Sequence, residues 1–164
     1  MAAAAKADDT PALHRLANAE NVNACNEKGL TPLHVAGRHG NCAAAVVLAD
    51  AGADANAVDR RGRTPLWMAA SNGHDLMVRI LLTLGSDPRL GGEAGTPLLM
   101  AAQEGHVGAV RALVEAGGVD PDHADAQGRT PMFVAAREGN AAVARELFKL
   151  GADPGGWVGG WVGG

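Results

Sequence analysis

Residues 63–74 read Arg-Thr-Pro-Leu-Trp-Met-Ala-Ala-Ser-Asn-Gly-His and predict one short helix with a marked start and a marked end. Thr64 suits the N-cap, because its hydroxyl oxygen can accept a backbone N–H that has no partner inside the helix. Pro65 suits the first helical position, where a missing N–H costs nothing. Gly73 suits the left-handed conformation with which many helices end. A short helix is therefore expected between Thr64 and Gly73.

The same pattern occurs four times along the chain. Its Thr-Pro pairs begin at Thr31, Thr64, Thr96 and Thr130, at intervals of 33, 32 and 34 residues. A glycine always follows the threonine after nine residues, and a second glycine follows the first after twelve. Only the return segment to the next threonine varies in length, which is typical of a loop on one face of a solenoid.

A second helix is expected after each inner glycine, for example over residues 74–84 and 141–150. We predict one domain over residues 1–154, followed by a Gly/Trp/Val tail over 155–164. Residues 1–25 are expected to form a polar N-terminal cap, with Thr10 and Pro11 opening a helix, because the end of a solenoid needs a polar face. The repeats are placed at 26–58, 59–90, 91–124 and 125–154.

These units resemble the ankyrin repeat, whose pattern is Asp-x-x-Gly-x-Thr-Pro-Leu-His-x-Ala, then Gly, Val-x-x-Leu and Gly-Ala-Asp. Residues 29–36, 62–70 and 128–136 carry the first part of the pattern, and residues 52–54 and 151–153 carry the last. The resemblance covers about residues 10–154. It implies an all-α ankyrin-repeat solenoid of stacked helix-turn-helix units, with β-hairpin finger loops and a curved outline.

Departures from the pattern concern the histidine that follows Thr-Pro-Leu. His34 is present in the first repeat, whereas Trp67, Leu99 and Phe133 replace it in the others. The resemblance implies that this histidine bonds to its threonine and braces the neighbouring repeat, so the later repeats are expected to depend more on apolar packing. Residues 91–95 lack the leading Asp and predict a loose or remodelled finger. His74 and His106 are expected to bond across repeats, as the family's histidines do at this position.

The composition indicates an intracellular, non-membrane protein. The net charge is −4, the hydrophobic content is 47% and aromatic residues make up 3%. Cys25 and Cys42 are expected to be free thiols in a reducing compartment. No signal peptide is recognisable, and Asp50 and Arg79 interrupt the two apolar runs that come nearest to a membrane span.

No catalytic motif is present, so we expect no enzyme activity, no cofactor, no metal and no small-molecule substrate. Cys42 with His39 is the nearest approach to a reactive thiol pair, but Cys42 is better explained as opening a second helix that faces the core. Residues 120–125 hold three aspartates and a histidine. They could bind a divalent ion, but a finger that carries Asp at its usual turn positions is the preferred explanation.

Basic residues are expected to gather on the concave face. Arg60, Arg61 and Arg63 are placed at one finger tip, Lys28 and Arg129 on other fingers, and Arg38 and Arg137 on first helices, with Trp67 as an apolar anchor if it is not buried. This face predicts a protein partner with an acidic segment. A solvated face without a partner is the alternative, and nucleic acid is disfavoured because no aromatic platform accompanies the arginines.

The tail holds Trp157 and Trp161, two of the three tryptophans. By composition it is flexible. The alternatives are that it folds back over the last repeat or that its indoles bind a neighbouring protein.

We therefore predict a non-enzymatic protein–protein interaction module, an adaptor or scaffold. A structural subunit of a cytoskeletal or ciliary assembly, held also by its tail, is the alternative. A third possible function is that of a stoichiometric inhibitor of a kinase or another enzyme.

Overall fold

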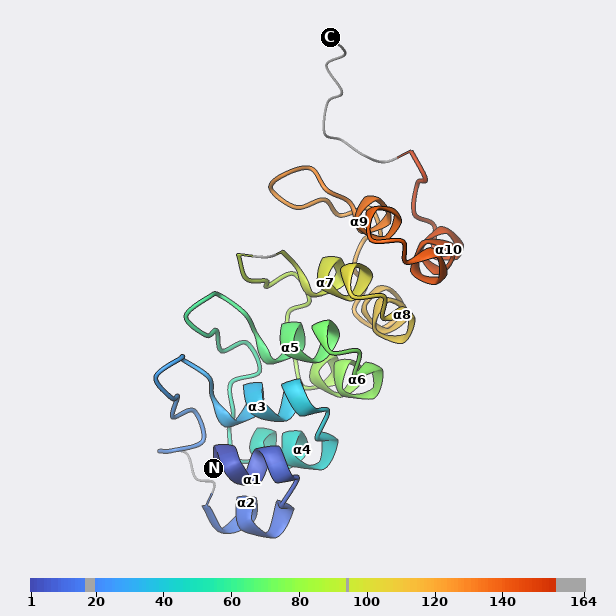
Figure 1. The fold of residues 1–164 in the computed structure, drawn as a ribbon. Coiled ribbons are helices and arrows are strands. Elements are labelled where there is room, and N and C mark those ends of the chain that lie inside the picture. The colour runs from blue at the N-terminus through green and yellow to red at the C-terminus, as the bar shows by residue number, and fades with distance from the viewer. Residues whose placement is uncertain (17–19, 94, 156–164) are drawn as a thin grey trace.

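The computed structural model describes residues 1–16, 20–93 and 95–155, which form ten helices arranged as five hairpins in a curved row (Figure 1). The helices are α1 (Ala2–Ala7), α2 (Thr10–Leu16), α3 (Pro32–His39), α4 (Cys42–Asp50), α5 (Pro65–Ser71), α6 (Asp75–Thr83), α7 (Pro97–Gln103), α8 (Val107–Glu115), α9 (Pro131–Arg137) and α10 (Ala141–Lys149). The expected all-α solenoid is confirmed.

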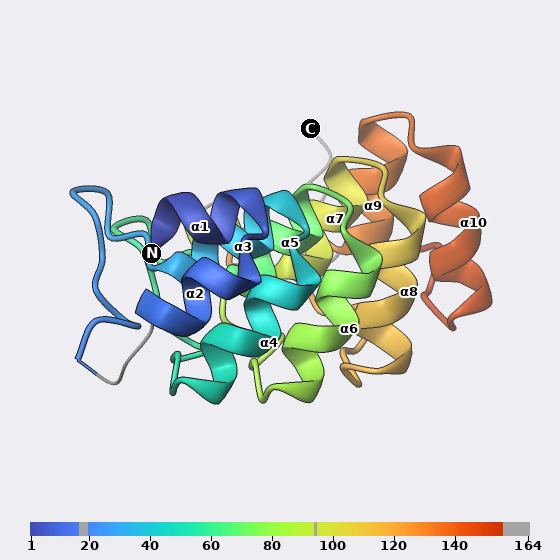
Figure 2. The same ribbon diagram turned by 90° about the horizontal axis from the view of Figure 1, so that it is seen from below.

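The helices lie in two layers. The first helices α1, α3, α5, α7 and α9 pack in one layer, and the second helices α2, α4, α6, α8 and α10 pack in the other (Figure 2). Each helix has its extensive contacts with its own hairpin partner and with the adjacent hairpins. The fold therefore grows by addition of units, and distant repeats do not share one globular centre.

The predicted helix starts and ends are confirmed. Thr64 Oγ1 accepts the Trp67 N–H at 3.1 Å, and Thr96 and Thr130 cap α7 and α9 in the same way. Gly73 has a φ of +72° just after α5, as expected of a residue that ends a helix. These bonds span only three residues, which is why the sequence predicted them.

The loops that lead into α3, α5, α7 and α9, called fingers below, project on one side of the stack (Figure 1). In the second finger Asp59 N–H donates to the Arg63 carbonyl at 3.0 Å, and Gly62 N–H donates to the Asp59 carbonyl at 3.0 Å. In the described residues the fingers are tight turns without named strands, and one isolated bridge joins Gly92 to Gly95.

The N-terminal unit contains a helix that the sequence did not predict. Thr10 opens α2, which is the second helix of this unit, and α1 takes the place of a first helix against α3. Its register follows from one contact: Asn41 Nδ2 donates to the Lys6 carbonyl at 2.8 Å, as Asn140 Nδ2 donates to the Gln103 carbonyl at 2.6 Å. Lys6 therefore occupies the position of Gln103.

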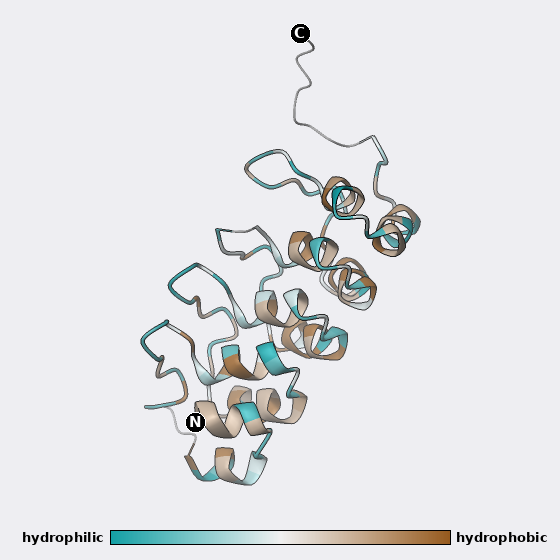
Figure 3. Cartoon of the chain, in the orientation of Figure 1, coloured by the Kyte–Doolittle hydropathy of each residue, from teal (hydrophilic) through white to brown (hydrophobic). Residues whose placement is uncertain are grey.

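Alanine, leucine, valine and methionine side chains form the core between the two layers, and polar residues lie on the fingers and outer faces (Figure 3). Leu33, Leu66 and Leu98 repeat the same buried position in successive first helices. Alanines beside them allow the helices to approach closely. No helix among the described residues has the length and apolar character needed to cross a bilayer.

Candidate functional site

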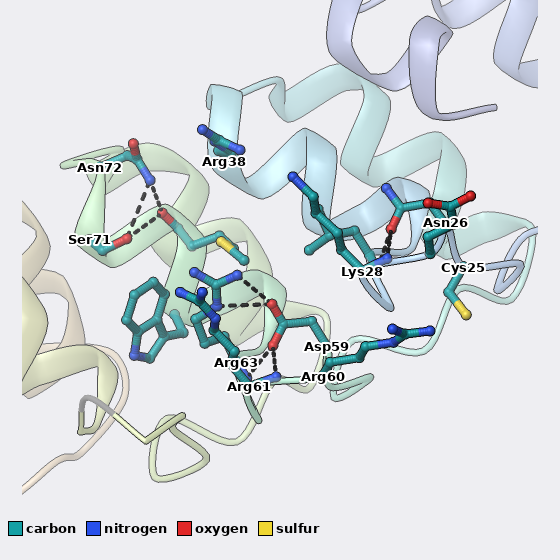
Figure 4. Close-up of a pocket in the computed structure, with 14 residues that line it drawn as sticks. Cys25, Asn26, Lys28, Arg38, Asp59, Arg60, Arg61, Arg63, Ser71 and Asn72 are labelled. Carbon is teal, nitrogen blue, oxygen red and sulfur yellow. Dashed lines mark hydrogen bonds and ion pairs between the residues drawn. The ribbon is translucent and has the colours of Figure 1, made fainter.

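A groove of about 1210 Å³ lies between the first two fingers and the helices α3 and α5 (Figure 4). Six of the residues predicted to bind a partner line it, namely Lys28, Arg38, Arg60, Arg61, Arg63 and Trp67. Arg38 comes from the end of α3, Lys28 comes from the first finger, and the other three arginines come from the second finger. The structure therefore brings most of the predicted basic face into one hollow.

Side-chain oxygens hold the two finger tips in shape. Asn26 Oδ1 accepts the Lys28 N–H at 2.9 Å, and Asp59 Oδ1 accepts the N–H groups of Arg61 and Arg63 at 2.9 Å each. The fingers are also tied to each other, because Arg60 N–H donates to the Lys28 carbonyl at 3.3 Å. The cationic side chains thus start from a fixed backbone.

Arg63 is not a free cation in this groove. Its Nη2 donates to Asp59 Oδ2 at 2.6 Å, and its guanidinium lies 5.3 Å from the centre of the Trp67 ring. Burial raises the pKa of Asp59, but the hydrogen bonds from Arg63 and Arg61 outweigh it and hold the carboxyl pKa below its usual 3.8. The ion pair of Asp59 with Arg63 therefore stabilises the second finger itself.

The remaining cations of the groove are available. Lys28, Arg38, Arg60 and Arg61 are exposed, and among the described residues no carboxylate lies within ion-pair distance of them. Four positive side chains therefore face one hollow without an internal partner.

The expected role of Trp67 as a partner anchor depends on its not being buried, and this condition is not met, because the residue is only 7% exposed. Its indole Nε1 instead donates to the Gly95 carbonyl at 3.0 Å, in the next finger. The later repeats were expected to depend more on apolar packing, and Trp67 does pack in an apolar cluster with Met68 and Met100. Its indole also supplies a cross-repeat bond like the one that the histidine supplies one repeat earlier.

His34 makes the contacts that the resemblance implied. Its Nδ1 lies 2.8 Å from Thr31 Oγ1 and its Nε2 lies 2.9 Å from the Arg63 carbonyl. Burial lowers the pKa of His34 below 6.5, so the ring is held neutral. His74 Nε2 and His106 Nε2 contact carbonyls of the preceding repeat at 3.1 and 3.3 Å, which confirms the expected bonds across repeats.

Two other predicted basic residues lie outside the groove. Arg129 is bound to Asp125 at 2.6 Å in the last finger, and Arg137 is bound to Glu138 at 2.6 Å at the end of α9. The structure therefore does not join them to the cationic cluster. Trp157 and Trp161 lie outside the described residues.

Several residues of the groove were not predicted. Leu30 and Met68 form its apolar floor, and Ser71 and Asn72 lie on its rim. Ser71 stands seven residues after its threonine, as Arg38 does after Thr31, so the repeat offset was a signal that could have identified it.

Cys42 and two aspartates of residues 120–125 are held by contacts within the chain. Burial raises the pKa of the Cys42 thiol, and its Sγ donates to the Gly40 carbonyl at 3.4 Å, so the thiol is not activated. Asp122 accepts the Asp153 N–H at 3.0 Å, and Asp125 is held by Arg129. Within the described ranges no three side chains of metal-binding type come together.

A family model of three ankyrin repeats matches residues 1–92 and 86–155. The chain belongs to the ankyrin-repeat family. The match includes α1 and α2, in agreement with their place in the stack. A search of curated proteins found no match. Ankyrin repeats are generally protein–protein interaction modules, and the family is typically non-enzymatic. The groove is therefore a candidate surface for a protein partner.

Proposed function

We propose that this ankyrin-repeat protein is an adaptor or scaffold that binds an acidic segment of a partner protein in the groove. The observation that carries the proposal is the set of four cations without internal partners, Lys28, Arg38, Arg60 and Arg61. A partner with carboxylates would supply the missing counter-charges and would be steered to this face.

The charge distribution supports an acidic partner although the chain carries a net charge of −4. Two acidic residues on the second helices form ion pairs there, Glu146 with Arg111 at 2.6 Å and Glu115 with Arg79 at 3.6 Å. These acidic pairs lie away from the groove, which is lined by five cationic residues and by the carboxylates of Glu27 and Asp59. Because hydrogen bonds of the backbone hold the fingers in place, little conformational entropy is lost when a partner binds.

A protein segment fits the groove better than a nucleic acid does. Single-stranded nucleic acids need aromatic rings on which bases stack. Trp67, the tryptophan that lines the groove, is buried and its ring is covered by Arg63.

The proposal is tested with a fluorescent peptide of six glutamates, its glutamine counterpart, and the double variant Arg60→Glu/Arg61→Glu. The glutamate peptide should bind the wild type, and the double variant should weaken binding about tenfold at low salt, because two attractions become repulsions. Arg15→Glu/Arg145→Glu makes the same charge change on α2 and α10, outside the groove, and should bind as the wild type does.

Circular dichroism checks that the variants keep their helices. Equal binding by both double variants would reject the groove. If a single-stranded oligonucleotide displaces the fluorescent peptide at a lower concentration than the unlabelled glutamate peptide does, a nucleic acid partner is favoured instead.

A second candidate role, a subunit of a larger assembly held also at its C-terminal end, is favoured by Phe148. This side chain of α10 is 62% exposed on the last repeat. Trp157 and Trp161 of the following tail would then bind the neighbouring subunit. Deleting residues 156–164 should release such a subunit from its assembly, whereas an adaptor that uses only the groove should keep its partner.

A further inference from the structure

A second hollow, of about 310 Å³, lies between α1 and α3 and adjoins the groove. Leu30, Arg38 and Met68 line both hollows, so the two are continuous. The second hollow is bounded on the far side by α1, which contributes Ala2, Ala3 and Lys6. Its volume is at the lower limit of ligand pockets and suits one side chain rather than a folded element.

The hollow is open because α1 carries small side chains where the other repeats carry large ones. The register set by Asn41 places Ala3 in the position of Val35 in the next repeat and of Met68 in the one after that. By the same register Ala2 corresponds to His34. Two methyl groups therefore stand where longer side chains would fill the space above α3.

The walls of the hollow are apolar and its rim is positive. Val35, Leu30 and Met68 supply the apolar surface, and Lys6 and Arg38 stand at the rim. In the part of the chain that the structure describes, neither cation has a carboxylate within ion-pair distance.

His39 also lines the hollow, beside Lys6 and Arg38. Partial burial lowers the pKa of His39, and the positive charges of Lys6 and Arg38 lower it further. The same two cations would attract a carboxylate. An entering chain thus meets positive charge first and apolar surface behind it.

We propose that the acidic partner segment inserts one aliphatic or aromatic side chain into the hollow between α1 and α3, while its carboxylates contact Lys28, Arg60 and Arg61. This rests on the proposed function and adds the anchor to it. Exposed charges contribute little each, whereas one fully buried side chain contributes as much as several of them. The N-terminal unit is then part of the binding site and not only an end cap.

The probes are peptides of four glutamates that also carry one leucine or, in the matched control, one alanine. This residue is placed between one and six positions away from the glutamates. Fluorescence anisotropy gives the affinities. The best leucine peptide should bind about tenfold more tightly than its alanine counterpart. It should also shift the methyl NMR signals of Ala2, Ala3, Val35 and Met68.

The decisive variant is Ala3→Met, which fills the hollow with the residue that the second and third repeats carry at this position. It should remove the leucine advantage and leave the affinity of the alanine peptides unchanged. Ala7→Met changes an exposed residue on the same helix, outside the hollow, and should retain the advantage. Both methionines suit a helix, so folding should be preserved.

Two results would overturn the anchor while glutamate peptides still bind better than glutamine peptides. In the first, leucine gives no gain in affinity over alanine at any spacing, and in the second, the Ala3→Met variant keeps that gain. The proposed function fails separately, and the anchor with it, if glutamate and glutamine peptides bind alike. Binding of the leucine peptides that shifts only methyl groups elsewhere also rejects the anchor.

Discussion

The Trp67 indole donates a 3.0 Å hydrogen bond to the Gly95 carbonyl, which joins the second repeat to the third. One repeat earlier His34 Nε2 and the Arg63 carbonyl stand in the same relationship at 2.9 Å. A ring N–H from the third residue of a first helix thus reaches the next finger in both repeats. Leu99, which follows in this series, has no such group.

Trp67→Phe is expected to lower the free energy of unfolding by about 1–2 kcal/mol, since it removes this hydrogen bond and part of the ring that contacts Arg63. Urea denaturation followed by circular dichroism measures the loss. Amide hydrogen exchange should also become faster in the described finger residues 91–93 and 95. Met100→Leu, a conservative change in the same apolar cluster, should leave that exchange unchanged. A variant Trp67→Phe with wild-type exchange would show that the indole bond does not hold the finger.

Gly37→Ala is expected to destabilise the protein although it replaces glycine inside a helix. A Cβ at this position would lie 2.6 Å from the Pro65 carbonyl oxygen, because α3 and α5 approach closely there. The helix-propensity gain of about 1 kcal/mol is smaller than the 1–3 kcal/mol typical of overpacking. The melting temperature should therefore fall. An increase would mean that α3 and α5 separate easily.

Stability should decrease as the pH falls below about 6.5, in part because of His34. Burial lowers the pKa of His34 in the folded state, so the unfolded chain binds a proton first and is favoured as the pH falls from 6.5 toward that lowered value. The difference between the unfolding free energies at pH 7.5 and 5.5 should be smaller in His34→Gln than in the wild type. His39→Gln, at an exposed position on the same helix, should reduce it less. An unchanged difference in His34→Gln would contradict a buried neutral ring.

Leu82→Ala should cost about 1–2 kcal/mol, whereas Phe148→Ala should change stability by about 0.5 kcal/mol or less. Both residues stand nine positions after the inner glycine of their repeats. Leu82 packs against the core beneath the next repeat, where Gly117 is close to it, whereas Phe148 is exposed on the last repeat. Denaturant titrations compare the two. Similar costs would indicate that another part of the chain covers Phe148.

The period, the helix starts and the helix ends were predictable from the sequence because they depend on short-range chemistry. The bond from Trp67 N–H to Thr64 Oγ1 crosses three residues, and the φ of Gly73 is a property of one residue. The groove was predictable in part for the same reason. Fixed offsets from Thr-Pro place Arg60 and Arg61 on one finger and Arg38 on the facing helix.

Only the tertiary structure decided which of these side chains are available. The burial of Trp67 depends on a finger 28 residues further along the chain. The helix α1 has no Thr-Pro signal and is too short to be stable alone, so its presence and register depend on packing against α3. The exposure of Phe148 depends on its place at the end of the row. The local sequence thus determined the helices and turns of each unit. Stacking determined which side chains each unit exposes, because the exposure of a side chain depends on neighbours that lie about one repeat away.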